Sequence, residues 1–366
     1  MRGRAPGRLD LLGGVADYSG SLVLEVPTRQ GTEVTVQPAS TFVVGETSFS
    51  EAALGELAQA SYPSIRVALA DVPRWIHYVL GVALVLVRYG VIAPPRGRLH
   101  IASDLPSSVG AASSAALEVA TARALGGDDI DPLRLAALCQ EAENQVVGAP
   151  CGIMDQVAVT LGQAESVLPI VCRPASVELP VALPDGVEVV GWPTGATHDV
   201  GADPYRTARA AAFMGKRMME DGSGSRVEWV SELDPTLVAQ LPEVMTGAEF
   251  LARWPDHGDD LTVVERDRAY PVRAATSFGV HEHQRTTTAL QGLREGDVST
   301  LASAMAASHA GYDAMGLGHR AADAVVERAL ATPGVLGARS SGGGAGGTVV
   351  VVTEAGALDG IDGLIR

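Results

Sequence analysis

The sequence of 366 residues contains a single lysine, Lys216, beside 26 arginines. No Gly-x-x-x-x-Gly pattern precedes that lysine, so a Walker-type phosphate loop has no lysine available. This absence excludes the nucleotide-binding folds that depend on such a loop. Only 4% of the residues are aromatic, and the formal net charge is −16. The field of the whole protein therefore repels nucleic acid and anionic membrane surfaces.

Cysteines and long hydrophobic runs are also scarce. The three cysteines have neither metal-ligand spacing nor an even number, which indicates reduced thiols in a cytoplasm. The longest apolar run, residues 79–87, is too short for a membrane span and predicts a buried helix. Residues 1–4 lack the apolar core of a signal peptide. We therefore expect a cytoplasmic protein that binds neither nucleic acid nor membrane.

The whole sequence is 46% hydrophobic and 19% charged, which is typical of a globular chain with helices and strands. The length exceeds that of one ordinary core, so we expect two domains. Proline and glycine cluster at 180–186, and we place the domains at 1–183 and 184–366. The expected strands lie at 22–26, 33–36, 42–44, 98–102 and 187–191, and two more flank 340–347. The expected helices lie at 75–88, after residue 116 up to 125, at 132–147 and at 206–220, with two more between 284 and 331.

Two segments carry most of the chemical information. Residues 4–28 mix arginines, acids and glycines with apolar runs, which indicates a polar substrate held at a buried edge. Residues 98–125 read as strand, loop and helix, an arrangement that directs backbone N–H groups at an anion. The small residues 110–114 let a polyphosphate approach the main chain, and the hydroxyls of Ser113 and Ser114 can bind phosphate oxygens or a metal. The alternative is an ordinary loop with a serine cap.

Four motifs follow one another along the chain: Arg4–Arg8 with Asp17–Gly20, Pro106–Ala116 preceded along the chain by Trp75-x-x-Tyr78-x-x-Gly81, Glu143–Gln156, and Ser341–Gly347. In this order they resemble the superfamily of galactokinase, homoserine kinase, mevalonate kinase and phosphomevalonate kinase, the GHMP kinases. The resemblance implies an α+β fold, with a ribosomal S5 domain 2-like N-terminal domain and a ferredoxin-like C-terminal domain. It also implies a sugar 1-kinase that uses ATP and Mg²⁺. One departure is Ala112, where the family usually has glycine or serine.

The resemblance assigns roles to individual residues. Asp155 takes the proton of the sugar hydroxyl or orients it, and Arg8 stabilises the charge that develops on the transferred phosphate. Glu143 holds Mg²⁺ together with a serine of the loop, Ser113 or Ser114, of which we expect Ser114. The residues expected at the sugar are Asp17, Gly14, Tyr205 and Gly152. Those expected at the nucleotide are Pro106, Gly110, Ala111, Ala112, Ser113, Ser114, Ala115 and Trp75, with Gly342, Gly343, Gly344 and Gly346 forming a loop that braces the site.

The groups that residues 14–18 lack limit which sugar the protein is expected to bind. Galactokinases carry Glu-His-Thr/Ser-Asp-Tyr here, and that glutamate helps read the hydroxymethyl group of galactose, whereas this chain has Gly14-Val-Ala-Asp17-Tyr. A buried acceptor without its hydroxyl would cost about 1–3 kcal/mol, so its loss suits a substrate without that group. The fuller phrase at 8–24 resembles plant-type L-arabinokinases, and L-arabinose is a pentose that lacks the sixth carbon. Because nothing here matches the large amino-terminal half of those proteins, we expect a stand-alone kinase, either a monomer or a homodimer.

Several alternatives stay open at this point. The sugar could be galactose, a uronic acid, a heptose or a longer-chain sugar, although a uronate calls for a cation near Gly14 and that segment shows none. A galactokinase-like sensor that binds ATP and sugar without turnover is a further alternative, disfavoured because Arg8, Glu143 and Asp155 are all present. His281-Glu282-His283 resembles a metal pair without a third ligand, and we expect it to be a solvated loop.

Overall fold

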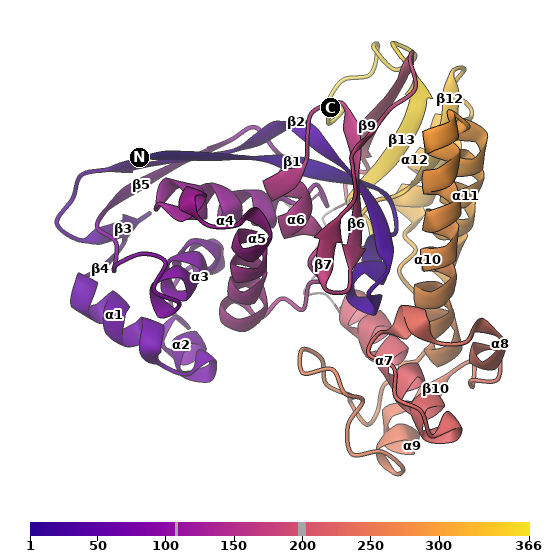
Figure 1. Ribbon diagram of the computed structural model, residues 1–366, viewed down its shortest axis with the longest axis horizontal. Coiled ribbons are helices and arrows are strands. Elements are labelled where there is room, and N and C mark those ends of the chain that lie inside the picture. Colours follow the sequence, from indigo (N-terminus) through magenta and orange to yellow (C-terminus); the bar gives the residue numbers. More distant parts are fainter. Residues whose placement is uncertain (107–108, 197–202) are drawn as a thin grey trace. The chain divides into compact units, whose positions relative to one another are not determined.

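The computed structural model describes residues 1–106, 109–196 and 203–366 (Figure 1). The chain forms two compact units, each discontinuous in sequence. Unit 1 comprises Met1–Arg8, Pro27–Ser107 and Ala112–Gly162, and unit 2 comprises Leu9–Val26, Ser108–Ala111 and Gln163–Arg366. Strands β1 (Arg2–Leu12) and β2 (Leu22–Gln37) each run through both units. A domain boundary at residue 183 stays a prediction.

Unit 1 packs helices against a sheet built on the second half of β2. Residues Thr32–Gln37 pair antiparallel with β5 (Gly97–Ser103), and β5 pairs parallel with β3 (Phe42–Val44). Helix α3 (Arg74–Arg88) is buried from Val79 to Leu86, which confirms the buried helix predicted there. The other elements of unit 1 are β4 (Thr47–Phe49), α1 (Glu51–Gln59), α2 (Tyr62–Ala68), α4 (Ser113–Ala124), η2 (Gly127–Asp129), α5 (Pro132–Glu141), η3 (Ala142–Val147) and α6 (Met154–Leu161).

Unit 2 contains an antiparallel sheet in the order β12 (Val335–Ser340), β13 (Thr348–Glu354), β9 (Val187–Pro193). The first residues of β2 pair with β6 (Ser166–Cys172). The long helices of this unit are α7 (Asp203–Ser223), α10 (Val272–Glu295), α11 (Val298–Ala314) and α12 (Arg320–Leu330). Its shorter elements are η1 (Gly14–Ser19), β7 (Ala175–Val177), β8 (Val181–Ala182), η4 (Val230–Glu232), α8 (Pro235–Val238), β10 (Met245–Thr246), α9 (Gly247–Leu251) and β11 (Ala269–Tyr270).

The expected helix over 132–147 is present but changes character along its length. Asp131 caps α5, because its carboxylate accepts the backbone N–H of Arg134 at 2.9 Å. The α-helix ends at Glu141 and continues as one π-helical stretch, η3, which Gly148 closes at φ 78°. Such wider turns are frequent at functional sites, and this one carries Glu143.

Two expectations from the sequence are corrected. The strands expected at 22–26 and 33–36 are parts of the single strand β2. His281-Glu282-His283 is not a solvated loop, because α10 already begins at Val272 and includes it. Glu282 is fully buried there, and its carboxylate accepts the N–H of Gly13 at 3.2 Å and the hydroxyl of Ser308 at 2.5 Å. The partners of buried Glu282 lie far away in the sequence.

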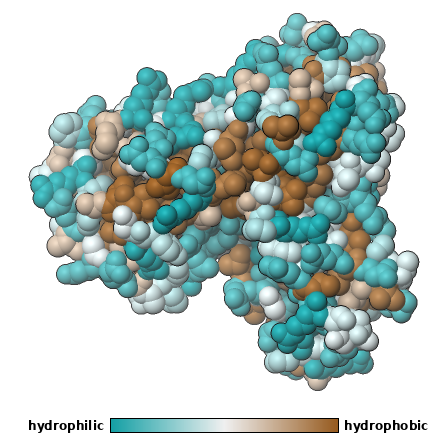
Figure 2. Space-filling model, in the orientation of Figure 1, coloured by the Kyte–Doolittle hydropathy of each residue, from teal (hydrophilic) through white to brown (hydrophobic). Residues whose placement is uncertain are grey.

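Figure 2 shows hydrophobic residues gathered in the interior of the drawn face, with hydrophilic residues around them. Exposed large hydrophobic side chains of the described chain include Trp75 and Leu179. Across the described ranges, every helix is too short or too polar to cross a membrane. The fold is thus a mixed α+β arrangement, as expected.

Candidate functional site

Arg8 and Asp155 form the central ion pair of unit 1. Arg8 lies on β1, and Asp155 lies in the first turn of α6. The Nε and Nη2 atoms of Arg8 donate to the same carboxylate oxygen, Oδ1 of Asp155, at 2.9 and 2.7 Å. The arginine side chain is 3% exposed and the aspartate side chain 19%. A carboxylate held in this way has a fixed direction while part of it stays open to a ligand.

Glu143 lies close to this pair and is almost completely buried. Burial raises its pKa to about 7, and the charge of Asp155 acts in the same direction. Hydrogen bonds from Cys151, Ser114 and Gln156 act against this shift. The Nε2 atom of Gln156 donates to Oε2 of Glu143 at 2.7 Å. The carboxyl of Glu143 and the hydroxyl of Ser114, both expected at the metal, therefore lie together.

A second buried carboxyl, Glu118 on α4, was missed in the sequence. It is fully buried, and Nε2 of Gln156 donates to its Oε2 at 3.1 Å, so one amide bridges Glu118 and Glu143. Burial raises the pKa of Glu118 well above its ordinary value, and the charges of Glu143 and Asp155 add to this rise. The available signal was an acidic residue in an otherwise alanine-rich helix directly after the serine pair.

These oxygens suit a hard divalent cation. Mg²⁺ keeps several waters and takes one or two protein carboxylates besides the phosphates of a substrate. Glu143 and Ser114 could supply that small set. In the part of the chain that is described, no group of three or more His, Cys, Asp or Glu side chains is placed to hold a metal by itself. The donor set thus fits a cation shared with a nucleotide, and does not form an all-protein cage.

The expected phosphate loop leads from β5 to α4. Gly110 has φ 77°, and Ala112 stands at the N-cap of α4 with φ 55°, a left-handed conformation that is rare for alanine. Within the described residues, no side chain caps this helix. In unit 2, the hydroxyl of Thr348 donates to the carbonyl of Val109 at 2.6 Å, which ties the glycine-rich loop to the phosphate loop. The other expected nucleotide residues include buried Ala111 and Ala115, half-buried Pro106 and Ser113, and Trp75, which is 46% exposed on α3.

The expected sugar residues of unit 2 gather around η1. Asp17 is buried, and the ring of its neighbour Tyr18 meets the ring of Tyr205 edge-on at 5.9 Å. The guanidinium of Arg209 lies over the Tyr18 ring at 5.3 Å. Tyr205 thus contacts the residue that directly follows Asp17 in the chain. Gly152 is buried just before α6 in unit 1.

Gly14 lies in a buried polar cluster that we call the Asp10 cluster: Asp10, Tyr312 and Arg339 with the backbone of Gly14 and Gly342. Arg339 donates through Nη1 to Oδ2 of Asp10 at 2.9 Å, and both side chains are fully buried. Gly14 has φ 50°, and a Cβ there would stand 1.9 Å from the Tyr312 hydroxyl. The cluster joins the first motif to the glycine-rich loop, whose residues Gly342, Gly343, Gly344 and Gly346 are all buried.

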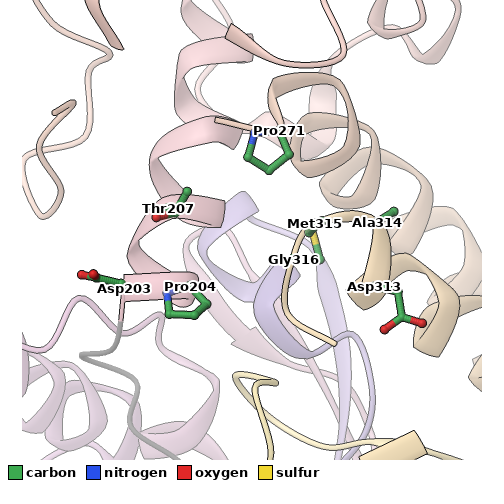
Figure 3. A pocket seen from close by; sticks show the side chains of 8 residues that line it. All are labelled: Asp203, Pro204, Thr207, Pro271, Asp313, Ala314, Met315 and Gly316. Atoms are coloured by element: carbon green, nitrogen blue, oxygen red, sulfur yellow. The ribbon is translucent and has the colours of Figure 1, made fainter. Parts of the chain in front are cut away.

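A surface hollow of about 490 Å³ lies in unit 2, between the start of α7 and the end of α11. Figure 3 shows Asp203 and Thr207 on the first turns of α7, with Asp313 and Gly316 across the hollow at the end of α11. Tyr205 and Tyr312 belong to the same two helices. Among the residues that line the hollow in the described chain, none is an expected sugar residue.

Comparison with known proteins connects these motifs to one family. The model "GHMP kinases N terminal domain" matches residues 77–163, and "GHMP kinases C terminal" matches residues 289–361. Galactokinase of Chloroflexus aggregans is 32% identical over 97% of this chain and 84% of its own length. L-arabinokinase of Arabidopsis thaliana is 31% identical over 95% of this chain, which spans only 42% of that protein. Lactococcus lactis galactokinase, solved with galactose, has a similar fold, with a TM-score of 0.77 and 22% identity over 98% of this chain and 87% of its own.

The chain therefore belongs to the GHMP kinase family, and the expected two-domain GHMP fold is confirmed. Within that family it is an ATP-dependent sugar kinase of the galactokinase and L-arabinokinase type, with a sugar and ATP as its substrates. The individual residue roles, a monomeric or homodimeric state and a cytoplasmic location stay predictions.

Proposed function

We propose that this protein transfers the γ-phosphate of ATP to the anomeric hydroxyl of L-arabinose and so forms L-arabinose 1-phosphate. The observation that carries the choice of sugar is Gly14. This residue has no side chain, its backbone is left-handed, and the Tyr312 hydroxyl occupies the place of a Cβ. Position 14 therefore presents no carboxylate that could read a hydroxymethyl group, and a pentose needs none.

The residues of unit 1 supply the groups for transfer. Asp155 would accept the proton of the anomeric hydroxyl or orient that hydroxyl for in-line attack on the γ-phosphorus. Arg8, fixed by two hydrogen bonds to Asp155, would stabilise the negative charge of the transferred group. Glu143 and Ser114 would hold Mg²⁺, which neutralises phosphate charge when bound. Asp17 would accept hydrogen bonds from ring hydroxyls of the sugar.

The relatives support sugar phosphorylation but do not choose the sugar by themselves. Identity to the Arabidopsis L-arabinokinase is 31%, and identity to the Chloroflexus galactokinase is 32%. The choice of L-arabinose therefore depends on residues 14–18, where the chain departs from the galactokinase pattern.

A substrate screen tests the proposal. The purified protein is assayed with ATP, Mg²⁺ and coupled detection of ADP against L-arabinose, galactose, fucose, glucuronate and heptoses. We expect L-arabinose to give the highest kcat/KM, and the Asp155→Asn variant supplies the background. Equal kcat/KM for galactose and L-arabinose would refute the argument from Gly14.

A further inference from the structure

We infer that Tyr312 is a specificity-determining positioning residue: through the Asp10 cluster, it holds the segment 13–17 in the shape that binds a pentose. Tyr312 lies on α11, 297 residues after Val15 in the sequence. The inference rests on the proposed function, because it needs residues 13–17 to contact the sugar. It concerns unit 2 alone.

The Tyr312 hydroxyl links two backbone segments. It accepts the N–H of Val15 at 3.1 Å and donates to the carbonyl of Gly342 at 2.5 Å. The side chain is fully buried, and its ring meets Phe278 edge-on at 5.5 Å. Neither backbone group can turn to water in this buried place. The hydroxyl therefore decides where Val15, two residues before Asp17, lies relative to the glycine-rich loop.

The Asp10 carboxylate makes a parallel link. Its Oδ1 accepts the N–H of Gly14 at 3.0 Å, and its Oδ2 accepts the N–H of Gly342 at 2.9 Å. Arg339 pairs with the same carboxylate, and both side chains are fully buried. Tyr312 and Asp10 thus fix the same two segments from two directions, and the path of residues 13–15 is over-determined.

The left-handed turn at Gly14 follows from this arrangement. Its amide points at Asp10, and the space beside its Cα is taken by the Tyr312 hydroxyl at 1.9 Å and by Oδ2 of Asp10 at 2.9 Å from an ideal Cβ. Two features therefore exclude a side chain at position 14: the left-handed backbone and the hydroxyl of Tyr312. Introducing a glutamate alone would displace the segment and would not create a reader of a sixth carbon.

The first test uses Tyr312→Phe, which keeps the ring and removes only the hydroxyl. We expect KM for L-arabinose to rise about tenfold, equivalent to about 1.4 kcal/mol, with KM for ATP within about twofold of the wild type. The matched control is Tyr270→Phe. Tyr270 is also buried in unit 2, and its hydroxyl accepts the backbone N–H of Glu265 at 2.8 Å, but it lies outside the cluster. The control should lose stability in a similar way and keep KM for L-arabinose unchanged.

The second test is a double-mutant cycle with Gly14→Ala. The left-handed backbone penalises alanine equally in both backgrounds, so the coupling isolates the clash with the hydroxyl. We expect Gly14→Ala to raise KM for L-arabinose at least fivefold more in the wild type than in Tyr312→Phe. Equal effects in both backgrounds, or an equal rise of the two KM values in Tyr312→Phe, would overturn the inference.

Failure of the proposed function looks different. A wild-type enzyme that prefers galactose refutes the pentose assignment whatever the variants do. A wild-type enzyme that prefers L-arabinose, combined with an unchanged KM for L-arabinose in Tyr312→Phe, refutes only the role of Tyr312.

Discussion

Arg8 and Asp155 are 147 residues apart in the sequence, and two nitrogen atoms of the arginine converge on one oxygen of the aspartate. Two donors on a planar guanidinium restrict the carboxylate more strongly than a single point charge could. The aspartate consequently has one preferred direction within unit 1. This restriction is useful for a group that must orient a hydroxyl, because small displacements of reacting groups reduce the rate strongly.

Replacing Asp155 by asparagine should reduce kcat by about 10²–10⁴, the range typical for loss of a general base. ATP binding, measured by calorimetry, should stay close to that of the wild type, since the phosphate loop is unchanged. Asp131→Asn is the matched control, because asparagine caps a helix as well as aspartate does. If Asp155→Asn keeps full turnover, Asp155 is not the base.

Replacing Ala112 by glycine should raise the melting temperature or leave it unchanged. Glycine adopts φ 55° without the steric cost of about 1–2 kcal/mol that a Cβ carries there, and this gain opposes the greater freedom of the unfolded glycine. Ala116→Gly, in the interior of the same helix, is the control and should destabilise by about 1 kcal/mol. Thermal unfolding of the two variants side by side measures the difference, and equal losses would show that Ala112 is unstrained.

Removing one partner of the buried pair Arg209–Asp259 should be strongly destabilising. Asp259 receives two hydrogen bonds from Arg209 at 2.9 Å and one from Thr262 at 2.6 Å. Asp259→Asn leaves the guanidinium without its counter-charge and should cost about 3–5 kcal/mol in the free energy of unfolding. Chemical denaturation measures this cost. Glu243→Gln, which breaks the exposed pair with Arg273, should have little effect.

The stability that the Arg209–Asp259 pair contributes depends on pH and is lost in acid. Burial raises the pKa of Asp259, but its bonds to Arg209 and Thr262 prevail and hold that pKa below the ordinary value. A carboxyl with a lowered folded pKa stabilises the protein above its unfolded pKa of about 4 and loses this contribution as the pH falls through the folded pKa. The difference between the wild type and Asp259→Asn should therefore shrink in acid.

For Glu118 we expect the opposite dependence of stability on pH. Its folded pKa is raised, so the folded state binds more protons, and stability falls as the pH rises above the unfolded pKa. Glu118→Gln removes this loss, since glutamine can still accept the N–H of Gln156. In chelator, we expect the melting temperature of the variant to exceed that of the wild type by a margin that grows from pH 5 to pH 8.5.

The control for Glu118 is Glu249→Gln on the exposed capping box of α9. Hydrogen bonds from Thr246 lower the pKa of Glu249, so its contribution to stability is complete above the unfolded pKa of about 4. Glu249→Gln should therefore lower the melting temperature by a margin that stays constant from pH 5 to pH 8.5. If the difference in melting temperature between Glu118→Gln and the wild type stays constant with pH, the pKa of Glu118 is not raised in the folded protein.

The sequence predicted the parts of the site that lie in local motifs. The serine pair after β5, the glycine-rich run at 341–347 and the segment 8–18 could each be recognised from spacing, and the family resemblance set Arg8 beside Asp155. The cap at Asp131 followed from the preference for aspartate before a helical proline. These features depend on neighbours in the chain.

The missed features depend on neighbours in space. Tyr312 and Arg339 are ordinary residues of a helix and a strand until the fold brings them to Gly14. The burial of Glu282 was predicted wrongly for the same reason, because its partners Gly13 and Ser308 lie 269 and 26 residues away. Sequence periodicity shows which residues turn inward, but not which charges meet there.

The Asp10 cluster also sets an order of events during synthesis. Asp10 leaves the ribosome among the first residues, yet its partner Arg339 is made 329 positions later. Contacts across such separations are slow to form because the ends of a long loop must meet. Unit 2 therefore cannot complete its folding on a growing chain before Gly342 has emerged. Until then, residues 13–17 lack the partners that fix their path.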